Sequence, residues 1–330
     1  MVIDFVVAWV DGGDPAWRKL RGAYLGSEET VDESRYREWD ILPYWFRAVE
    51  QFAPWVNKIY FVTCGQCPPW LNRNHPKLQL IDHKDFIPAE YLPTFNSMTI
   101  ELNLHRIPGL SEHFVYFNDD MHLNSPVTPE DFFVDGLPCE TAVMSTLNPV
   151  SVCDAHVHTI CNVMGIINSR FSKKAVLKKA PGKWYNLKYG KGLMKNLLNT
   201  PGSHFSCFTL PHVCSSMRKS IFEEVWELEY ERLHQACKEK FRASNGINQY
   251  IMSFFNLCKG EFYPRSSDFG RCYAIGSQSS AMLDDIRHHR HKVICINDNA
   301  DVADFEGEKA ALLEALQQAF PNRSTFEQDA

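Results

Sequence analysis

The sequence has no long apolar run and no excess of positive charge. None of its hydrophobic stretches approaches the roughly 18 residues that a membrane-spanning helix needs, so we expect a soluble chain that can still lie on a membrane surface. Its 34 Lys and Arg residues are outnumbered by 40 Asp and Glu residues, which gives a formal net charge of −6. A general basic surface for nucleic acid is therefore excluded, and an anionic ligand must be bound by a local group of basic residues.

The sequence also lacks a disulfide framework and a secretion signal. Its eleven cysteines are odd in number and scattered, and the amino terminus MVIDFVVAWVDGG has neither a basic segment nor a small-residue cleavage site. We therefore expect a reducing, cytoplasmic compartment. Cys64 and Cys67 have the spacing of a zinc or redox pair, but the sequence contains no second pair of cysteines with this spacing. A turn leaving a strand is the favoured interpretation of these two residues.

Strand-like and helix-like segments alternate along the first half of the chain. β-branched and aromatic residues fill the strand-like runs, which are residues 2–10, 58–65, 78–83 and 113–118. Apolar residues at helical spacing mark the helix-like runs, which are residues 16–26, 40–53 and 97–107. This alternation predicts a Rossmann-like α/β fold with a mixed or mostly parallel sheet and helices on both faces. Asp14 followed by Pro15 predicts a helix start.

The character of the sequence changes near residue 151, where longer helical patterns such as residues 220–241 begin. We therefore predict one domain with an α/β core over 1–150 and an added helical portion over 151–270. Residues 271–330 would return to the core with the last strand and a C-terminal helix.

Polar residues stand where three strand-like runs end. The run FVYFNDDMHL is the clearest case, and the residues concerned are Asp11, Gly12, Asn118, Asp119, Asp120, Asn297, Asp298 and Asn299. Ligands bind beyond the carboxyl ends of the strands in such sheets, so we expect these residues to share one edge. The pair Asp119 and Asp120 has two interpretations. They are either turn formers or carboxylate ligands of a hard divalent cation.

Two other stretches invite a functional reading. Residues 169–192 contain eight Lys or Arg residues around Trp184 and Tyr185, and they are either a solvated loop or a flexible cover over an anionic substrate. The histidines of RHHRHK, residues 287–292, have cationic neighbours and no acid or cysteine spaced with them. A charged helix end is favoured there over a metal site.

Four separated motifs resemble the conserved regions of the Stealth family. The first is IDFVVAWVDGGDP, and the second runs from RYREWDILPYWFRAVEQF to HFVYFNDDMHL. The third begins at PHVCSSMRKSIFEEV and continues through EKFRASNGINQY, and the fourth is VICINDN. Together they span residues 3–299. The family includes bacterial capsular-polysaccharide phosphotransferases and the catalytic subunit of the animal N-acetylglucosamine-1-phosphotransferase.

The resemblance implies a reaction. A nucleotide-activated sugar, UDP-N-acetylglucosamine or a related UDP-hexose, would donate its sugar-1-phosphate to a hydroxyl of an acceptor saccharide, and UMP would leave. The core over 1–150 would bind the nucleotide sugar, and the helical portion would serve the acceptor or act as a lid. A bacterial cytoplasmic enzyme of capsular or exopolysaccharide synthesis, at the inner membrane face if it associates with a membrane, is the expected setting.

The resemblance also implies roles for individual residues. His212 would accept the proton of the attacking hydroxyl, Asp11 is the rival base, and Arg242 would clamp the diphosphate. Mg²⁺ or Mn²⁺ would be held by Asp119, Asp120 and Asp298. Substrate-binding roles fall on Trp9, Gly12, Arg37, Gln66, Ser97, Glu101, His105, Arg106, Asn118, Asn297 and Asn299. One departure is that Asn245 and Asn248 stand where the family often has an acidic residue.

Several of these residues have a structural alternative. Trp9 would either stack on a base or sugar or belong to the core, and Arg106 would either bind phosphate or pack on a helix. Two rival functions also remain open. A metal-dependent glycosyltransferase would use the same cleft and release UDP, and a non-catalytic nucleotide-sugar-binding module would share the fold.

Overall fold

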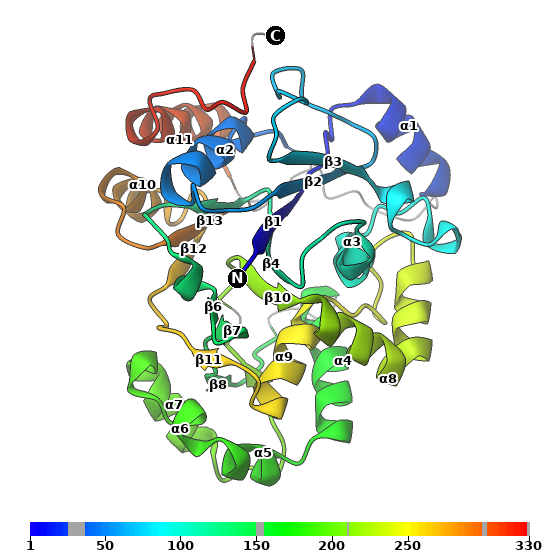
Figure 1. Ribbon diagram of the computed structural model, residues 1–330, viewed down its shortest axis with the longest axis vertical. Helices are drawn as coiled ribbons and strands as arrows, with labels where there is room; N and C mark the ends of the chain where they lie inside the picture. Colours follow the sequence, from blue (N-terminus) through cyan, green and yellow to red (C-terminus); the bar gives the residue numbers. More distant parts are fainter. Residues whose placement is uncertain (26–36, 150–154, 210, 299–301, 329–330) are drawn as a thin grey trace.

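The computed structural model describes residues 1–25, 37–149, 155–209, 211–298 and 302–328. Its centre is a mixed sheet with the strand order β10-β4-β1-β2-β3 (Figure 1). All of its strands run parallel except β10, which is antiparallel to β4 at one edge. The strands are β1 (Ile3–Ala8), β2 (Ile59–Thr63), β3 (Leu78–Asp82), β4 (His113–Asn118) and β10 (Ser215–Arg218). The predicted α/β fold is confirmed.

Helices cover both faces of this sheet because the strands are apolar on both. Along β1, Val6 packs into one buried cluster while Phe5 and Val7 pack into another. The first cluster includes residues of α4 (Ala155–Arg170), α8 (Lys219–Lys238) and α9 (Tyr250–Lys259). The second includes residues of α2 (Leu42–Phe52), α10 (Ser279–His288) and α11 (Phe305–Ala319).

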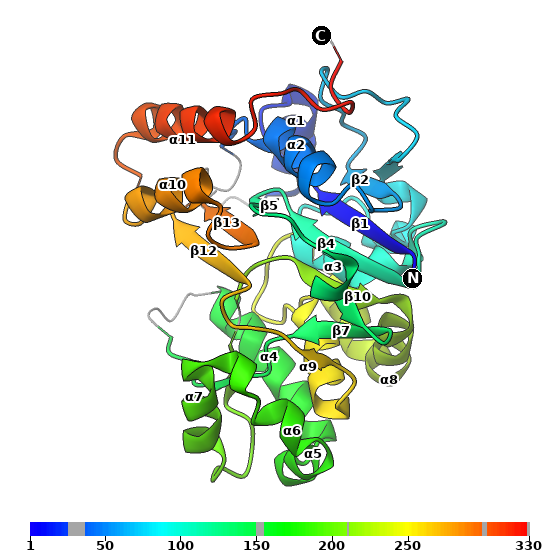
Figure 2. The same cartoon turned by 60° about the vertical axis from the view of Figure 1, so that its left-hand side comes forward.

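A second, smaller sheet continues from the carboxyl end of β4. Its order is β12-β13-β5, with β12 (Gly270–Ala274) parallel to β13 (Val293–Asn297) and β5 (Met121–Leu123) antiparallel to β13. Figure 2 shows β5, β12 and β13 beside the main sheet, below α10 and α11. Only Asp119 and Asp120 separate β4 from β5, so this pair joins the two sheets.

The basic stretch of residues 169–192 is helical rather than a loop. It forms α5 (Lys173–Lys179), α6 (Pro181–Trp184), the 3-10 turn η6 (Leu187–Tyr189) and the start of α7 (Lys191–Asn199). Trp184 and Tyr189 are fully buried within it, because each supplies a large ring to the core beneath these helices. The expectation of a loop was wrong. Figures 1 and 2 show these helices at the lower end of the molecule, away from α2 and α11.

The remaining elements connect these layers. They are α1 (Pro15–Tyr24), α3 (Ser97–Asn103), β6 (Phe133–Val134), β7 (Leu137–Glu140), β8 (Met144–Ser145), β9 (Cys207–Phe208), β11 (Tyr263–Pro264), η2 (His83–Asp85), η3 (Ala89–Tyr91), η4 (Leu104–Arg106) and η5 (Pro129–Asp131). α1 begins as predicted, because the Asp14 side chain accepts a hydrogen bond from the Ala16 amide and Pro15 occupies the first helical position.

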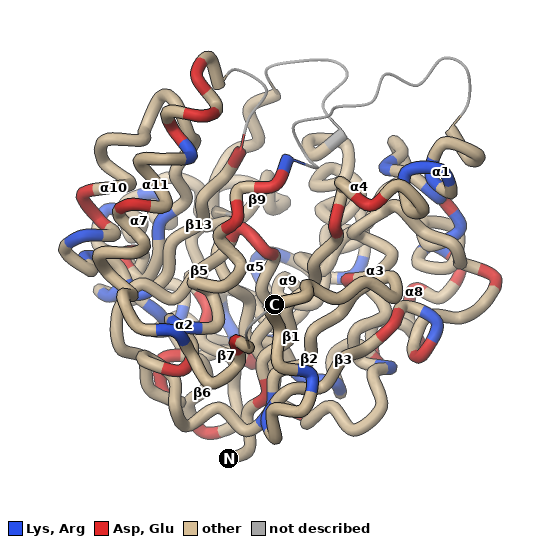
Figure 3. Tube along the Cα trace, turned by 90° about the horizontal axis from the view of Figure 1, so that it is seen from above, with Lys and Arg blue, Asp and Glu red and all other residues tan. Residues whose placement is uncertain are grey.

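Charges of both signs are interspersed around the fold. Seen from above, Asp and Glu lie on α10 and α11 while Lys and Arg gather on α1 (Figure 3). Within the described residues, no helix combines the length and the apolar character that crossing a membrane requires.

Candidate active site

The turn between β4 and β5 concentrates carboxylates at the carboxyl edge of the main sheet. Partial burial raises the pKa of Asp119 to about 7, and the charges of Asp120 and Glu38 add to the effect. Burial likewise raises the pKa of Glu38, with Asp40 and Asp11 contributing. Asp119 therefore lies near enough to Asp120 and Glu38 to be affected by their charges, and Glu38 lies near enough to Asp11. Such an edge is electrostatically prepared for a cation.

Asp120 lies in a cluster with His212 and Cys295. Its Oδ2 is 3.8 Å from His212 Nε2 and accepts a hydrogen bond of 3.3 Å from the Cys295 thiol. One ligand atom from each of the three residues lies within 4.8 Å of the others. The other carboxylate oxygen, Oδ1, is buried without a hydrogen-bond partner among the described residues. A buried acceptor without a donor is costly, and a bound cation would satisfy it.

This environment sets the protonation of His212. Burial alone would lower its pKa, but the Asp120 carboxylate 3.8 Å away, aided by the charges of Cys272 and Glu101, raises the pKa above its usual value. Its Nδ1 lies 3.5 Å from the Tyr250 hydroxyl. The backbone of His212 has φ +36°, which is rare for a residue other than glycine. Strain of this kind is found at positions that the surrounding structure holds for function.

Glu101 and Arg242 lie next to His212. Glu101, on α3, is buried, and its Oε2 has no partner among the described residues. Burial raises the pKa of this carboxyl, and the positive charges of Arg242 and His212 partly oppose the rise. Arg242 also donates a hydrogen bond of 3.0 Å to the Ser97 hydroxyl. Ser97, Glu101, Arg242 and His212, which the sequence analysis selected from three distant segments, thus lie near one another.

The loop after β1 is held by Gln66. The Asp11 amide donates to Gln66 Oε1 at 2.8 Å, and Gln66 Nε2 donates to the Asp11 carbonyl at 3.0 Å and to Asp14 Oδ2 at 2.9 Å. Asp11 Oδ1 accepts a hydrogen bond of 2.7 Å from the Gly13 amide, and the Gly12 carbonyl accepts one from Arg18. Gln66 is therefore placed to position Asp11. Its predicted contact with substrate stays a prediction.

Asp298 is engaged differently from the other predicted metal ligands. It follows β13, where the Ile296 amide donates to the Asp120 carbonyl at 2.8 Å, so it emerges at the same edge. Both of its carboxylate oxygens accept hydrogen bonds from Arg37, at 2.7 and 3.0 Å, and Trp39 donates to one of them. Asp298 is thus an ion-pair partner of Arg37 rather than a member of the Asp120 cluster.

His105 and Arg106 lie at the opposite edge of the sheet. His105 stacks on Phe222 with 5.3 Å between ring centroids, and the Arg106 guanidinium lies 4.9 Å from the Trp226 ring. α8, which carries both rings, starts beside Glu112 at the amino end of β4, whereas Asp119 follows its carboxyl end. A six-residue strand is about 17 Å long. This packing favours the structural alternative for Arg106, and the substrate-binding roles of both residues stay predictions. His105 and Arg106 follow α3 toward the amino end of β4.

Other candidates occupy the ends of strands. Trp9 stacks on Phe61 with 5.7 Å between ring centroids and packs against the core, which favours its structural alternative. Asn118 ends β4 beside Ala8, and the Asn297 carbonyl accepts from the Ile275 amide. Asn299 lies outside the described residues.

The histidines of residues 287–292 and the pair Cys64 and Cys67 both lie where their structural interpretations predict. His288 ends α10 and pairs with Asp284, and His291 pairs with the buried carboxylate of Asp285. This agrees with the predicted helix end. Between Cys64 and Cys67, Gly65 has φ +88°, as the predicted turn requires.

Sequence reasoning missed four residues of this edge, which are Glu38, Tyr250, Cys272 and Cys295. Cys295 lies inside the quoted motif VICINDN, two residues before its polar end, so alternation along the strand was the available signal. Cys272 pairs with it across β12 and β13, and a hydrogen bond from Cys295 lowers the pKa of the Cys272 thiol. Tyr250 and Glu38 carried no such signal.

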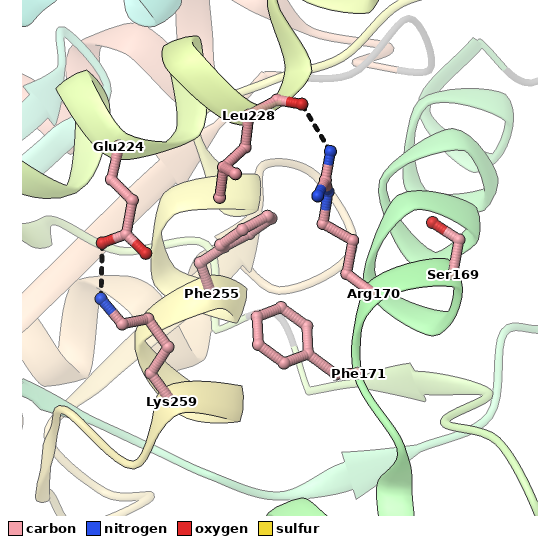
Figure 4. Close-up of a pocket in the computed structure, with 7 residues that line it drawn as sticks. All are labelled: Ser169, Arg170, Phe171, Glu224, Leu228, Phe255 and Lys259. Carbon is pink, nitrogen blue, oxygen red and sulfur yellow. Dashed lines mark hydrogen bonds and ion pairs between the residues drawn. The ribbon is translucent and has the colours of Figure 1, made fainter.

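A pocket lies elsewhere in the described structure. About 440 Å³ in volume, it is lined by residues of α4, α8 and α9 and the chain after α4, among them Arg170, Phe171 and Lys259 (Figure 4). Lys259 pairs with Glu224 at its rim, and Arg170 pairs with Glu229. Tyr250 and Lys259 stand at opposite ends of α9, about 14 Å apart along the helix axis. This pocket is therefore separate from the Asp120 cluster.

The fold and this edge define an α/β protein with an acidic, cation-accepting site flanked by arginines. Family models for three conserved regions match the chain, namely Stealth protein CR1 over residues 1–29, CR2 over 35–139 and CR4 over 284–330. With the full-length relatives described next, these matches show that the chain belongs to the Stealth family.

Three relatives align over nearly the whole chain. The capsular polysaccharide phosphotransferase WcwK of Streptococcus pneumoniae is 42% identical, with 98% of each chain covered. The exopolysaccharide phosphotransferase cps2G of Lactiplantibacillus plantarum is 41% identical, with 98% of this chain and 96% of that one covered. The receptor polysaccharide phosphotransferase WefC of Streptococcus gordonii is 40% identical, with 98% of each covered.

Among solved structures, the galactosyltransferase LgtC in complex with donor and acceptor sugar analogs aligns with 98% of each chain at 11% identity and a TM-score of 0.40. Mouse xyloside xylosyltransferase 1 aligns at 10% identity with a TM-score of 0.37, covering 90% of this chain and 98% of that one.

The structural role of His105 predicts a pH effect on stability. Burial, with the charges of Arg106 and Lys219, lowers the pKa of His105 to about 3 in the folded protein, against about 6.5 when unfolded. The unfolded chain therefore binds the proton first as the pH falls below 6.5. This one group should cost about 2 kcal/mol of unfolding free energy between pH 7 and pH 5. His105→Phe should remove that loss in urea titrations.

The same variant also tests whether His105 contacts the substrate. At pH 7.5, His105→Phe should stay within about 1 kcal/mol of the wild type, because the ring still packs on Phe222, and its transfer rate should be unchanged. A large loss of activity with unaltered stability would return His105 to the substrate.

Proposed function

We propose that this phosphotransferase moves a sugar-1-phosphate from a nucleotide-activated sugar to a hydroxyl of an acceptor saccharide, in capsular or exopolysaccharide synthesis. The observation that carries the proposal is the cluster at the β4–β5 turn, where a buried carboxylate oxygen of Asp120 lacks a donor and His212 lies 3.8 Å away. Relatives named as polysaccharide phosphotransferases, about 40% identical over nearly the full chain, support it.

The proposed reaction takes place at phosphorus. The acceptor oxygen attacks the phosphorus that bears the sugar, and a new phosphorus–oxygen bond forms. The bond from that phosphorus to the bridging oxygen breaks, and the nucleoside monophosphate leaves, UMP for a UDP-sugar donor. The bond between the sugar carbon and its oxygen is untouched, so the anomeric configuration is retained. Such a transfer depends on positioning and on stabilising charge.

His212 is the proposed general base. Its ring is 37% exposed, and its contacts with Asp120 and Tyr250, at 3.8 and 3.5 Å, are too long to occupy either nitrogen fully. A ring nitrogen is therefore available to accept the proton of the acceptor hydroxyl. Asp11 remains the rival base, since Gln66 fixes its backbone while only one of its carboxylate oxygens accepts from Gly13.

Arginines would receive the diphosphate. Arg242 reaches the site from beside Ser97, and the guanidinium of Arg37 already binds a planar anion, the Asp298 carboxylate, in a two-pronged arrangement. The same fork fits two phosphate oxygens. When the donor binds, Arg37 would either release Asp298 or bind Asp298 and the diphosphate together.

Asp119 and Asp120 would hold Mg²⁺ or Mn²⁺, with Asp298 close to them at the same edge. Two adjacent carboxylates and an unpaired buried oxygen suit a hard cation such as Mg²⁺ or Mn²⁺. When bound, the cation would neutralise charge on the diphosphate oxygens.

We place the enzyme in the cytoplasm, where nucleotide sugars are made, with peripheral contact to the inner membrane face. The described cysteines are all free, as expected in a reducing compartment.

The products test the function directly. Incubation with a panel of nucleotide sugars that includes UDP-N-acetylglucosamine, together with an acceptor saccharide, should release one UMP per sugar transferred. Chromatography of the nucleotides measures this. Release of UDP instead would assign a glycosyltransferase, and binding of donor without either product would assign a non-catalytic module.

Metal dependence is expected of the same assay. Activity should vanish with a chelator and return with Mg²⁺ or Mn²⁺, and Asp120→Asn should lower kcat at least ~100-fold, because the carboxylate acts on the transition state through the ion it holds. Mn²⁺ titration followed by electron paramagnetic resonance should show weakened binding to Asp120→Asn. Asp268→Asn, at an exposed position, is the matched control and should change neither quantity. Full activity in excess chelator would refute the metal role.

The two candidate bases can be separated by kinetics. His212→Ala should lower kcat by ~100-fold or more while donor KM changes little, because base catalysis acts only on the transition state. The control is His204→Ala, which removes an exposed histidine of the same segment. Near-normal kcat in His212→Ala, with a large loss in Asp11→Asn, would assign the base to Asp11.

A further inference from the structure

The lower end of the molecule exposes a group of large apolar side chains. Leu187, at the start of η6, is 85% exposed, and on α7 Leu198 is 73%, Met194 59% and Leu197 50% exposed. All four lie within twelve residues of one another. The other strongly exposed apolar residues of the described chain occur singly or in pairs on other elements. A concentrated apolar surface of this kind marks an interaction site.

The fold holds these side chains outward. Met194, Leu197 and Leu198 have the spacing of a single helix face. On the inner side, Asn196 is fully buried, its oxygen accepting from the Met144 amide and its nitrogen donating to the carbonyls of Ala142 and Trp184. These three hydrogen bonds anchor α7 to β8 and α6. The apolar face therefore cannot turn inward without breaking them.

The segment of the chain that carries this face is basic. From residue 155 to residue 222 the sequence has no Asp or Glu and eleven Lys and Arg residues, within a chain of net charge −6. The lysines that are exposed around η6 and α7 and on the neighbouring α5 are Lys174, Lys178, Lys179, Lys188, Lys191 and Lys195. Apolar side chains among lysines are the composition of protein surfaces that bind anionic lipid.

We propose that this surface, formed by Leu187, Met194, Leu197, Leu198 and the six exposed lysines, docks on an anionic phospholipid bilayer. The apolar side chains enter the boundary between headgroups and acyl chains, and the lysine ammonium groups contact lipid phosphates. A second copy of the chain fits less well, because a symmetric interface would place lysines against lysines. The proposal concerns a surface apart from the Asp120 cluster and does not depend on the transfer reaction.

Flotation of the purified full-length chain with vesicles tests the proposal without any sugar substrate. The chain should float with vesicles of equal parts phosphatidylglycerol and phosphatidylcholine, float poorly with phosphatidylcholine alone, and bind less as salt rises. Leu187→Gln/Leu198→Gln should lower the partition coefficient at least ~10-fold. Lys191→Gln/Lys195→Gln should lower it by a similar factor, since each surface lysine contributes about fivefold.

The matched control is Leu20→Gln/Leu80→Gln, which removes two exposed leucines of α1 and β3 and should leave binding unchanged. Circular dichroism verifies that each variant is folded, and transfer to a soluble acceptor should be equal in all of them. Absence of flotation at low salt, or equal losses in the control, would overturn the proposal. Sedimentation showing a dimer that the α7 variants abolish, without vesicle binding, would assign the surface to a second copy instead.

Discussion

The structure depends on one short connection, the two residues that carry the chain from the main sheet into the smaller one. Asn118 is paired with Ala8 of β1, and Met121 is paired with Cys295 of β13. The backbone of Asp119 and Asp120 is therefore fixed on both sides by strands that are buried in the core. Two carboxylates are held side by side there, and burial together with the charge of Asp120 raises the pKa of Asp119 to about 7. The extensive apolar packing of the two sheets offsets the free-energy cost of this repulsion.

Positively charged side chains surround these carboxylates, but they do not pair with every carboxylate oxygen. His212, Arg242 and Arg37 approach from three different segments, yet Asp120 Oδ1 still has no donor among the described residues. An acidic centre with a cationic margin matches a ligand pair made of a metal ion and a diphosphate, since each neutralises one part of the site. Neither ligand alone would balance both.

The sequence predicted what is local and missed what is long-range. The strand ends at Asp119 and Asp298 were predictable because each strand is an apolar run that polar residues interrupt. The positions of His105 and Arg106 were not, because α3 leads away from the site along the sheet, and no local pattern tells how far a connection travels. Residues 169–192 were interpreted as a loop or a flexible cover because eight Lys and Arg residues and several glycines stand within them, although buried Trp184 and Tyr189 supply the core that makes them helical. Cys295 escaped notice because a strand cysteine resembles any other core residue.

Positive and negative charges are separated along the length of the chain. Its acidic excess resides outside residues 155–222, while that segment is wholly basic among its ionisable residues other than Cys, His and Tyr. A protein with such a dipolar distribution orients as it approaches an anionic surface, because the basic end is attracted while the rest is repelled. Orientation would then come from the charge pattern and adhesion from the exposed leucines. A uniformly basic chain would adhere to the same anionic surface, but it would not be oriented on it.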